Sequence, residues 1–360
     1  MRINAKKTAK TPQRLLVIRT SALGDIAMVY PVLKALTSQY PDVELHFLCP
    51  QRWQPIFSDI VQLHFIDFNK KKHGDWKGLL FLTFRLRWKG FQGVIDLHHV
   101  LRSDYINRGL QLMGLKGYTL DKGRKEKAAL TRAENKVMEP LKTMHQRYAD
   151  VFVRAGFDFE LNGQARAPKR DVTETIQEQI GQDDLPWVGF APFAAHDGKR
   201  YPIEMSRQLV ERLDKNGKCK VLLFGGGMEE AEILKEWEGV SQGRVINLAE
   251  CLSFADELAV ISQLKLMISM DSGNGHLAAN FGVPVLTLWG VTHPFLGYAP
   301  FGQTEDYQLL VDRKEYPLIP TSVYGKKVPE GYEEAMSTIT VEKAFRKVLK
   351  LLRDQGDLKD

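Results

Sequence analysis

The sequence is poor in cysteine and has no long apolar run. Its 360 residues include three cysteines, Cys49, Cys219 and Cys251, which lie too far apart in sequence for a CxxC pair or a disulfide framework. No stretch approaches the ~18 apolar residues that a membrane-spanning helix needs. We therefore expect a soluble protein of a reducing compartment, the cytoplasm.

Several motifs of catalysis and cofactor binding are also missing. The sequence has no GxGxxG, no HExxH, no GxSxG and no cysteine-rich zinc spacing. It has no DxD triplet, which often holds a metal-bound nucleotide sugar. His98 and His99 are adjacent, so on a strand their side chains face opposite ways and cannot readily share a metal. We expect neither a metal nor a cofactor.

What is present is an ordinary globular composition with a mild cationic excess. Hydrophobic residues make up 44% and charged residues 26%, and 50 Lys and Arg against 44 Asp and Glu give a net charge of +6. The length is about twice that of a common domain, which predicts two domains. The charge is compatible with nucleic acid, a membrane surface or a phosphorylated substrate.

Short apolar runs alternate with helix-length amphipathic stretches in both halves of the chain. In the first half, the expected strands are residues 15–19, 43–49, 62–68 and 93–99. After a polar stretch at 165–171, they are residues 187–193, 220–227, 244–250, 266–273 and 284–290. This alternation predicts two Rossmann-like α/β domains with parallel sheets. Such sheets bind ligands at the carboxyl ends of their strands, around a cleft if the two domains face each other.

The first strand is followed by SALGD, residues 21–25. Asp25 lies at or near the start of the next helix, where a carboxylate is favoured by the helix dipole or serves as a cap. The alternative is a carboxylate base that points into a cleft. The motif by itself leaves both interpretations open.

The most informative segment is DSGNGH, residues 271–276, between an expected strand and an Ala-rich helix. Its glycines place backbone N–H groups at a helix start, an arrangement suited to a diphosphate. His276 could then reach a phosphate or a sugar hydroxyl. The alternative is a structural strand-to-helix turn with a capping Asp or Ser.

Two other strand ends carry suitable charges. Lys199 and Arg200 could neutralise a phosphate, or they could belong to a solvated basic loop. Glu229 or Glu230 could accept hydrogen bonds from the two hydroxyls of a ribose, or could simply complement a helix dipole.

Two basic stretches remain. Residues 69–91 mix lysines and arginines with five aromatic residues, a pattern that fits either an anionic lipid surface or an ordinary helix packed on a sheet. Residues 121–136 are cationic with few apolar residues and are expected to form a mobile loop for an anionic acceptor. No nucleic-acid motif accompanies either stretch.

SALGD, the lysine after the strand at Trp187, and DSGNGHLAANFGVPVLTLWGVTHP (residues 271–294) occur in this order. Together they resemble the ADP-heptose:lipopolysaccharide heptosyltransferases of glycosyltransferase family 9, over about residues 15–300. The resemblance implies a GT-B fold, with two Rossmann-like domains facing an interdomain cleft and a C-terminal helix that crosses back to the N-terminal domain. We accordingly expect an acceptor-binding domain at 1–168, a nucleotide-sugar-binding domain at 169–338 and the returning helix at 339–360.

The resemblance also implies an inverting, metal-independent transfer from ADP-heptose to an anionic glycolipid such as the lipopolysaccharide core. Asp25 takes the position of the catalytic base. The positions at the donor are Lys199, Glu229 (or Glu230 by one register step), Asp271, Ser272, Gly273 and His276. The cations expected at the acceptor are Arg102, Lys122, Arg124, Lys125 and Lys127.

One departure from the family pattern concerns the donor. The family usually has hydroxyl-bearing residues before the lysine, where this chain has Ala194 and Ala195. A nucleotide-sugar epimerase of GT-B-like architecture is one alternative, and a noncatalytic basic binding protein is another. We expect no nucleic-acid partner, and a peripheral contact with the cytoplasmic face of the inner membrane.

Overall fold

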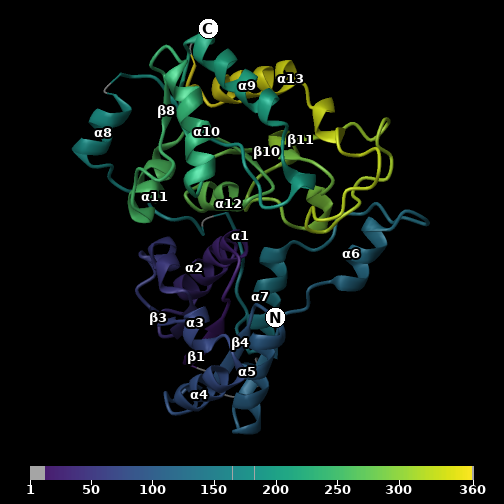
Figure 1. Cartoon of the computed structure of the whole chain (residues 1–360). Coiled ribbons are helices and arrows are strands. Elements are labelled where there is room, and N and C mark those ends of the chain that lie inside the picture. Colours follow the sequence, from purple (N-terminus) through teal and green to yellow (C-terminus); the bar gives the residue numbers. More distant parts are fainter. Residues whose placement is uncertain (1–12, 164, 182, 359–360) are drawn as a thin grey trace, which may run out of the picture. The chain divides into compact units, whose positions relative to one another are not determined.

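The computed structural model describes residues 13–163, 165–181 and 183–358 (Figure 1). The chain forms two compact units. The first comprises the described residues up to Lys122 together with Met144–Ala165. The second comprises Gly123–Thr143 and the described residues from Arg166 onward.

The first unit is built on a five-stranded parallel sheet in the order β3-β2-β1-β4-β5. Its strands are β1 (Arg14–Ile18), β2 (Glu44–Cys49), β3 (Leu63–Asp67), β4 (Gly93–Asp96) and β5 (Lys116–Thr119). Its helices are α1 (Leu23–Ala27), α2 (Tyr30–Gln39), η1 (Gln51–Phe57), α3 (Lys70–His73), α4 (Trp76–Arg87), α5 (Leu101–Leu112) and α7 (Met144–Arg154). The central strand β1 is apolar and buried because it has neighbours on both sides and helices over the sheet.

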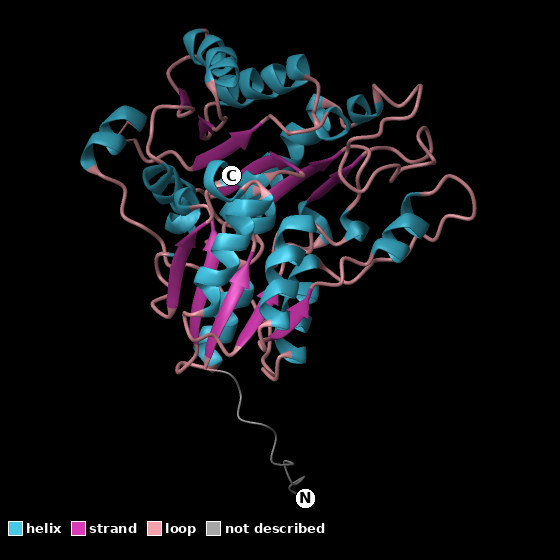
Figure 2. Cartoon of the chain, turned by 60° about the horizontal axis from the view of Figure 1, so that its bottom comes forward, coloured by secondary structure: helices cyan, strands magenta, loops and turns pink. Residues whose placement is uncertain are grey.

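The second unit has a six-stranded parallel sheet in the order β11-β10-β9-β6-β7-β8. Its strands are β6 (Trp187–Ala191), β7 (Lys220–Leu223), β8 (Val245–Asn247), β9 (Leu266–Met270), β10 (Val285–Trp289) and β11 (Gln308–Leu310). Its α-helices are α6 (Arg124–Thr131), α8 (Glu174–Ile180), α9 (Ile203–Asn216), α10 (Met228–Gly239), α11 (Phe254–Gln263), α12 (Gly273–Asn280) and α13 (Val341–Asp354). Its 3-10 turns are η2 (Asp197–Lys199), η3 (Pro294–Leu296), η4 (Glu305–Tyr307) and η5 (Ala335–Thr338). Helices cover the sheets in both units, as Figure 2 shows.

The two parallel α/β sheets expected from the sequence are therefore confirmed. The strands are shorter than the apolar runs suggested, and β5 and β11 were missed because KGYT and QLL are short and partly polar. β4 ends at Asp96 instead of continuing to His99. The reason is local: the Asp96 carboxylate accepts hydrogen bonds from the amides of His98 and His99, which turns the chain.

The division into units also differs from the expected boundaries. Residues 121–136 were expected to form a mobile loop, but Arg124–Thr131 is helix α6 and belongs to the second unit. The segment is held there by hydrogen bonds from Lys136 Nζ to the carbonyl of Pro320 (2.6 Å) and from the Leu141 amide to the carbonyl of Phe295 (2.9 Å).

The last helix belongs to the second unit as well, whereas we expected it to return to the N-terminal domain. The apolar side chains of α13, including Val348 and Leu352, are part of the core of the second unit. An ion pair between Arg212 of α9 and Glu342 adds to this packing.

Candidate functional site

Each sheet has one point at which the chain reverses the direction in which it adds strands. In the first unit this point lies between β1 and β4, and in the second it lies between β6 and β9. Loops that follow two such strands diverge to opposite faces of the sheet and leave a crevice at their carboxyl ends, where open α/β sheets bind ligands. Asp25 follows β1, Lys199 follows β6 and Asp271 follows β9. These three predicted site residues therefore lie at the two switch points.

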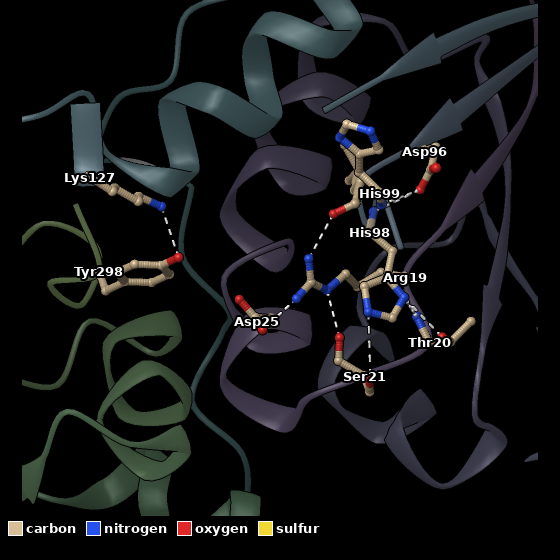
Figure 3. Close-up of polar contacts among 10 residues, drawn as sticks. Arg19, Thr20, Ser21, Asp25, Asp96, His98, His99, Lys127 and Tyr298 are labelled. Atoms are coloured by element: carbon tan, nitrogen blue, oxygen red, sulfur yellow. Dashed lines mark hydrogen bonds and ion pairs between the residues drawn. The ribbon is translucent and has the colours of Figure 1, made fainter. Parts of the chain in front are cut away.

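At the switch point of the first unit, Asp25 is paired with Arg19 (Figure 3). Asp25 lies in the first turn of α1, whose N-cap is Ala22, so it is a first-turn carboxylate and not the cap. The Arg19 side chain is 5% exposed and that of Asp25 is 28% exposed. The carboxylate is thus held by a buried cation while part of it remains accessible to a ligand.

The same guanidinium is fixed by two backbone carbonyls. Arg19 Nη1 donates to the carbonyl of Leu97 (2.8 Å), and Nε donates to the carbonyl of Ser21 (2.8 Å). Leu97 follows β4 and Ser21 follows β1, so Arg19 ties the two loops of the switch point together. A planar guanidinium can bind three acceptors in this way because its N–H groups point in fixed, divergent directions.

His98 lies on the other side of the β1 loop. Its Nδ1 lies 3.0 Å from Thr20 Oγ1 and accepts a hydrogen bond from the Thr20 amide, while its Nε2 lies 3.4 Å from Ser21 Oγ. This pattern assigns the proton to Nε2. Burial lowers the pKa of His98 to about 3, with a further contribution from Arg19, so the ring is neutral at physiological pH.

Asp96 organises the turn that carries both histidines. One carboxylate oxygen accepts from the amides of His98 and His99, each at 2.9 Å, and the other accepts from Ser103 Oγ at 3.1 Å. Burial raises the pKa of this fully buried carboxyl group despite the hydrogen bonds. His99 points away from His98, with Nδ1 at 2.8 Å from the carbonyl oxygen of Leu120. The two rings thus have different partners, but they lie on the turn after β4 and not, as the sequence had predicted, on a strand.

At the switch point of the second unit, Lys199 and Asp271 form an ion pair. The distance from Nζ to Oδ2 is 2.6 Å, and Nζ also donates to the Asp271 carbonyl at 3.2 Å. The turn that carries Lys199 is packed tightly against Gly325, where a Cβ would lie 2.5 Å from Lys199 Cγ. The ammonium group is thereby placed at the junction of β9 and α12.

Helix α12 begins directly after this ion pair. Its N-cap is Ser272, whose side chain makes no capping hydrogen bond. The first backbone N–H groups of a helix have no partner within the helix, and they carry the positive end of its dipole. His276, one turn further on, is buried. A cation and uncapped helix amides therefore converge where the sequence predicts a diphosphate.

The acidic residues after β7 are now distinguishable. Glu230 Oε2 accepts a hydrogen bond from the Gly226 amide (2.9 Å), and Glu250 Oε1 accepts one from the Gly227 amide (2.6 Å). Glu229, in the first turn of α10, is exposed. Of the two candidates, Glu230 shapes the glycine loop and Glu229 presents its carboxylate to solvent.

The cations expected at the acceptor do not form one group. Arg102 and Lys122 belong to the first unit, and both contribute to lowering the pKa of His98. Arg124 and Lys125 are exposed on α6 in the second unit. Lys127 is buried, and its Nζ donates to the Tyr298 hydroxyl at 2.8 Å and lies over the ring (Figure 3). Lys127 thus anchors α6 to its own unit.

Over the part of the chain that the structure describes, no three His, Cys, Asp or Glu residues are grouped so that they could hold a metal ion.

The comparison with known proteins decides the family. The sequence profile of glycosyltransferase family 9 (heptosyltransferase) matches residues 80–317. The chain belongs to glycosyltransferase family 9. As a member of this family it is an enzyme, a glycosyltransferase, and its two parallel sheets match the GT-B architecture.

Family 9 relatives and structures are similar over nearly the whole chain. The lipopolysaccharide core heptosyltransferase OpsX of Haemophilus influenzae is 22% identical over 82% of this chain and 84% of its own length. A family 9 glycosyltransferase from Veillonella parvula has a TM-score of 0.70, with 19% identity over 95% of this chain and 97% of its own. The structure of E. coli ADP-heptose LPS heptosyltransferase II has a TM-score of 0.66, with 21% identity over 95% of this chain and 99% of its own.

The sequence did not assign a role to three side chains at the switch point of the first unit: Arg19, Asp96 and His98. A weak signal existed for each, since a charged residue or histidine directly after a buried strand is costly unless it has a partner. The sequence could not identify the partners that come from the neighbouring strand end, which are Leu97 for Arg19 and the β1 loop for His98.

Proposed function

We propose that this enzyme transfers a heptose from ADP-heptose to a lipopolysaccharide core or related glycolipid, with inversion and without a metal. The observation that carries the proposal is the Lys199–Asp271 pair beside the uncapped start of α12. This arrangement suits a diphosphate leaving group. The relatives support the choice of sugar and acceptor, since their names specify ADP-heptose and the lipopolysaccharide core.

In the donor half, Lys199 and the amides after Asp271 bind the diphosphate. Asp271 orients the ammonium group of Lys199, and Ser272, Gly273 and His276 line the same helix start. The exposed Glu229 accepts hydrogen bonds from the ribose hydroxyls. Ala194 and Ala195 supply no side-chain hydrogen bonds, so the backbone carries a larger share of donor binding in this chain.

In the acceptor half, Asp25 is the base. It accepts the proton of an acceptor hydroxyl while that oxygen attacks the anomeric carbon from the face opposite the nucleotide. The bond from the anomeric carbon to the diphosphate breaks, and ADP leaves with the electron pair, its charge stabilised by Lys199 and the helix amides. Arg102, Lys122, Arg124 and Lys125 attract the phosphates of the acceptor, whereas the buried Lys127 serves α6.

His98 does not compete for the role of base. Its pKa of about 3 makes the ring a poor proton acceptor, and both ring nitrogens already face Thr20 and Ser21. It instead fixes the β1 loop that precedes Asp25.

The donor is tested by thermal unfolding of the full-length protein with a panel of nucleotides and nucleotide sugars. A ligand that binds the folded state raises its stability. We therefore expect ADP and ADP-heptose to raise the Tm and UDP sugars to leave it unchanged. Stabilisation by UDP sugars alone would contradict the heptose assignment. Incubation with ADP-heptose and no acceptor should give no altered sugar, because a transferase needs an acceptor. An altered sugar would instead indicate an epimerase, which turns over the donor alone.

We also place this activity at the cytoplasmic face of the inner membrane, where a glycolipid acceptor would be presented. No helix of the described residues is long and apolar enough to cross a bilayer. The association would accordingly be peripheral and would need a surface of its own.

A further inference from the structure

Helix α4 has apolar side chains on two opposite faces. Leu79, Leu82 and Leu86 are buried against the first sheet. Five large apolar side chains are exposed on the opposite face: Trp76, Leu80, Phe81, Phe84 and Trp88. The exposed fraction is 65% for Phe81 and 83% for Trp88. A helix that only covers a sheet has a polar outer face. The outer face of α4 therefore requires another explanation.

Helix α5 extends this apolar surface. Its exposed residues Leu101, Tyr105 and Leu112 recur at helical spacing, and Leu101 and Leu112 are about nine-tenths exposed, at 91% and 90%. Ile106 and Leu110 of α5 pack in the same core cluster as the buried leucines of α4, so the two helices cover the same face of the sheet. Their outer faces consequently point the same way.

The two helices are also in close contact. A Cβ at Gly109 of α5 would lie 2.9 Å from Thr83 Cγ2 of α4, so glycine permits the close crossing. Arg102 Nε donates to the carbonyl of Gly74 at the junction of α3 and α4. The exposed apolar side chains of α4 and α5 thus belong to one surface, which we call the α4–α5 face.

The segment of α3 and α4 that belongs to this face carries many cations, and most of them are exposed. Between Lys70 and Lys89 there are seven, namely Lys70, Lys71, Lys72, Lys77, Arg85, Arg87 and Lys89. The single acidic residue in that range is Asp75, whose carboxylate accepts the Gly78 amide as the cap of α4. Seven cations less one carboxylate give +6 within 20 residues, equal to the net charge of the whole chain.

We propose that the α4–α5 face docks on an anionic phospholipid bilayer. Aromatic and aliphatic side chains would enter the interface between headgroups and acyl chains, and the lysines and arginines of residues 70–89 would pair with lipid phosphates. Exposed apolar side chains together with an excess of cations indicate a lipid surface. A protein partner would account for the apolar residues but not for the excess of one charge sign. Nucleic acid would account for the charge but not for the exposed leucines and phenylalanines. The inference rests on the proposed function only for its purpose, which is to bring the enzyme to a lipid-embedded acceptor.

The test is co-sedimentation of the full-length protein with vesicles that contain no glycolipid and no donor, so its outcome is independent of the transferase activity. We expect binding to phosphatidylglycerol-rich vesicles, and little binding to phosphatidylcholine alone. The triple variant Phe81→Ser/Phe84→Ser/Trp88→Ser should lose binding at least tenfold. The charge variant Lys77→Gln/Arg85→Gln/Lys89→Gln should bind vesicles about fivefold more weakly for each cation removed, and the loss should be greater at low salt.

A matched control removes exposed valines that lie outside this face. Val61, just before β3, and Val153, on α7, are both exposed. No residue of α7 belongs to the core cluster that contains the buried leucines of α4. Val61→Ser/Val153→Ser should bind vesicles like the wild type. The triple serine variant should keep wild-type transfer to an acceptor without its lipid chains, and should lose transfer to an acceptor embedded in vesicles.

Fluorescence shows which face inserts. Bound vesicles should shift the emission of Trp76 and Trp88 to the blue, and Trp76→Phe/Trp88→Phe should abolish the shift while keeping binding. The proposal is overturned if the wild type does not bind anionic vesicles, or if the triple serine variant binds them as tightly as the wild type does. It is also overturned if the face instead mediates self-association, seen as a wild-type dimer and a monomeric serine variant in sedimentation equilibrium.

Discussion

The carboxylate of Asp25 is paired with the guanidinium of Arg19, and that guanidinium also binds the carbonyls of Leu97 and Ser21. One buried arginine therefore connects the two strand ends at which the first sheet changes direction. It fixes the position of the carboxylate and leaves part of it accessible. In the proposed mechanism Asp25 is the base, and Arg19 is the residue that orients it.

Asp25→Asn removes the proposed base and keeps the shape of the side chain. We expect kcat to fall by about 10²–10⁴-fold, the usual contribution of a general base, with the donor Kd unchanged. Steady-state kinetics combined with donor titration measure the two effects. Near-wild-type transfer by a folded Asp25→Asn enzyme would remove Asp25 from the role of base.

Arg19→Lys keeps the charge but replaces a planar fork by a single ammonium group. The lysine cannot reach Asp25, Leu97 and Ser21 together, so we expect a lower kcat with little change in the donor Kd. Arg19→Met leaves a carboxylate and two carbonyls without their cation and should lower the free energy of unfolding by on the order of 3 kcal/mol. Urea unfolding measures this loss. Equal kcat in wild type and Arg19→Lys would mean that Arg19 stabilises the fold without positioning the base.

Lys199→Met should weaken donor binding by about 10- to 100-fold, which corresponds to the ~1.5–3 kcal/mol of a hydrogen bond to a charged group. It should also lower the Tm, because Asp271 would remain buried without its cation. Donor titration and thermal unfolding measure the two effects separately.

The double variant Lys199→Met/Asp271→Asn distinguishes donor binding from a purely structural ion pair. Removing both charges should recover much of the lost stability, because no uncompensated carboxylate remains. Donor binding should stay weak. Recovery of both properties would show that Lys199 serves only to neutralise Asp271.

The contribution of His98 to the stability of the enzyme should fall as the pH drops below about 6.5. The pKa of His98 is about 3 in the folded protein, against an ordinary value near 6.5, so between these values the unfolded chain binds a proton that the folded chain does not. The His98 contribution consequently rises with pH through this window and is constant above it, with a slope of at most about 1.4 kcal/mol per pH unit. Glu257, whose pKa burial raises to about 7, contributes with the opposite sign between about 4.5 and 7.

The variant His98→Gln, measured by urea unfolding between pH 4 and 7, tests this contribution. We expect a shallower pH dependence than in the wild type, whatever the change in absolute stability. The pH dependence that remains should reflect His293, whose pKa burial lowers to about 4, and Glu257, whose pKa burial raises to about 7 and which acts in the opposite sense. An unchanged slope would show that His98 is protonated in the folded protein.

Gly275→Ala tests the placement of α12 on the second sheet. A Cβ at this position would lie 2.5 Å from Ser269 Oγ of β9, so the helix start would have to move. We expect a loss of about 1–3 kcal/mol in the free energy of unfolding, together with weaker donor binding.

Ser269→Ala provides the rescue. Its hydroxyl is buried and makes no hydrogen bond, so its removal alone should be close to neutral. In Gly275→Ala/Ser269→Ala the next contact is Val285 Cγ1 at 3.3 Å, and much of the loss should be recovered. A double variant as unstable as Gly275→Ala would contradict the close approach of α12 to β9.

Local sequence patterns determined the elements and many of the site positions. The amphipathic stretch after the strand expected at 220–227 is α10, and the helix expected at 339–360 is α13, because the apolar residues of both follow the helical repeat. Asp25, Lys199 and Asp271 could be identified because each follows an apolar strand, where parallel sheets place their ligands.

The tertiary structure decided what those positions contact. Arg19 and Leu97 lie 78 residues apart in the sequence, and the guanidinium reaches the Leu97 carbonyl because β1 and β4 are neighbours in the sheet. Lys199 and Asp271 form an ion pair because β6 lies beside β9. Strand order is set by long-range pairing, which periodicity does not record.

The same limit applies to the helices. The sequence shows that residues 76–88 are rich in aromatics, but apolar residues on both sides of a helix do not reveal which side packs on the sheet. It likewise could not assign α6 and α13 to the second unit, since their partners Tyr298 and α9 are distant in sequence. Sequence thus determined the elements and their chemistry. Tertiary packing decided which side chains became core, site or exposed surface, because burial depends on contacts between segments far apart in the chain.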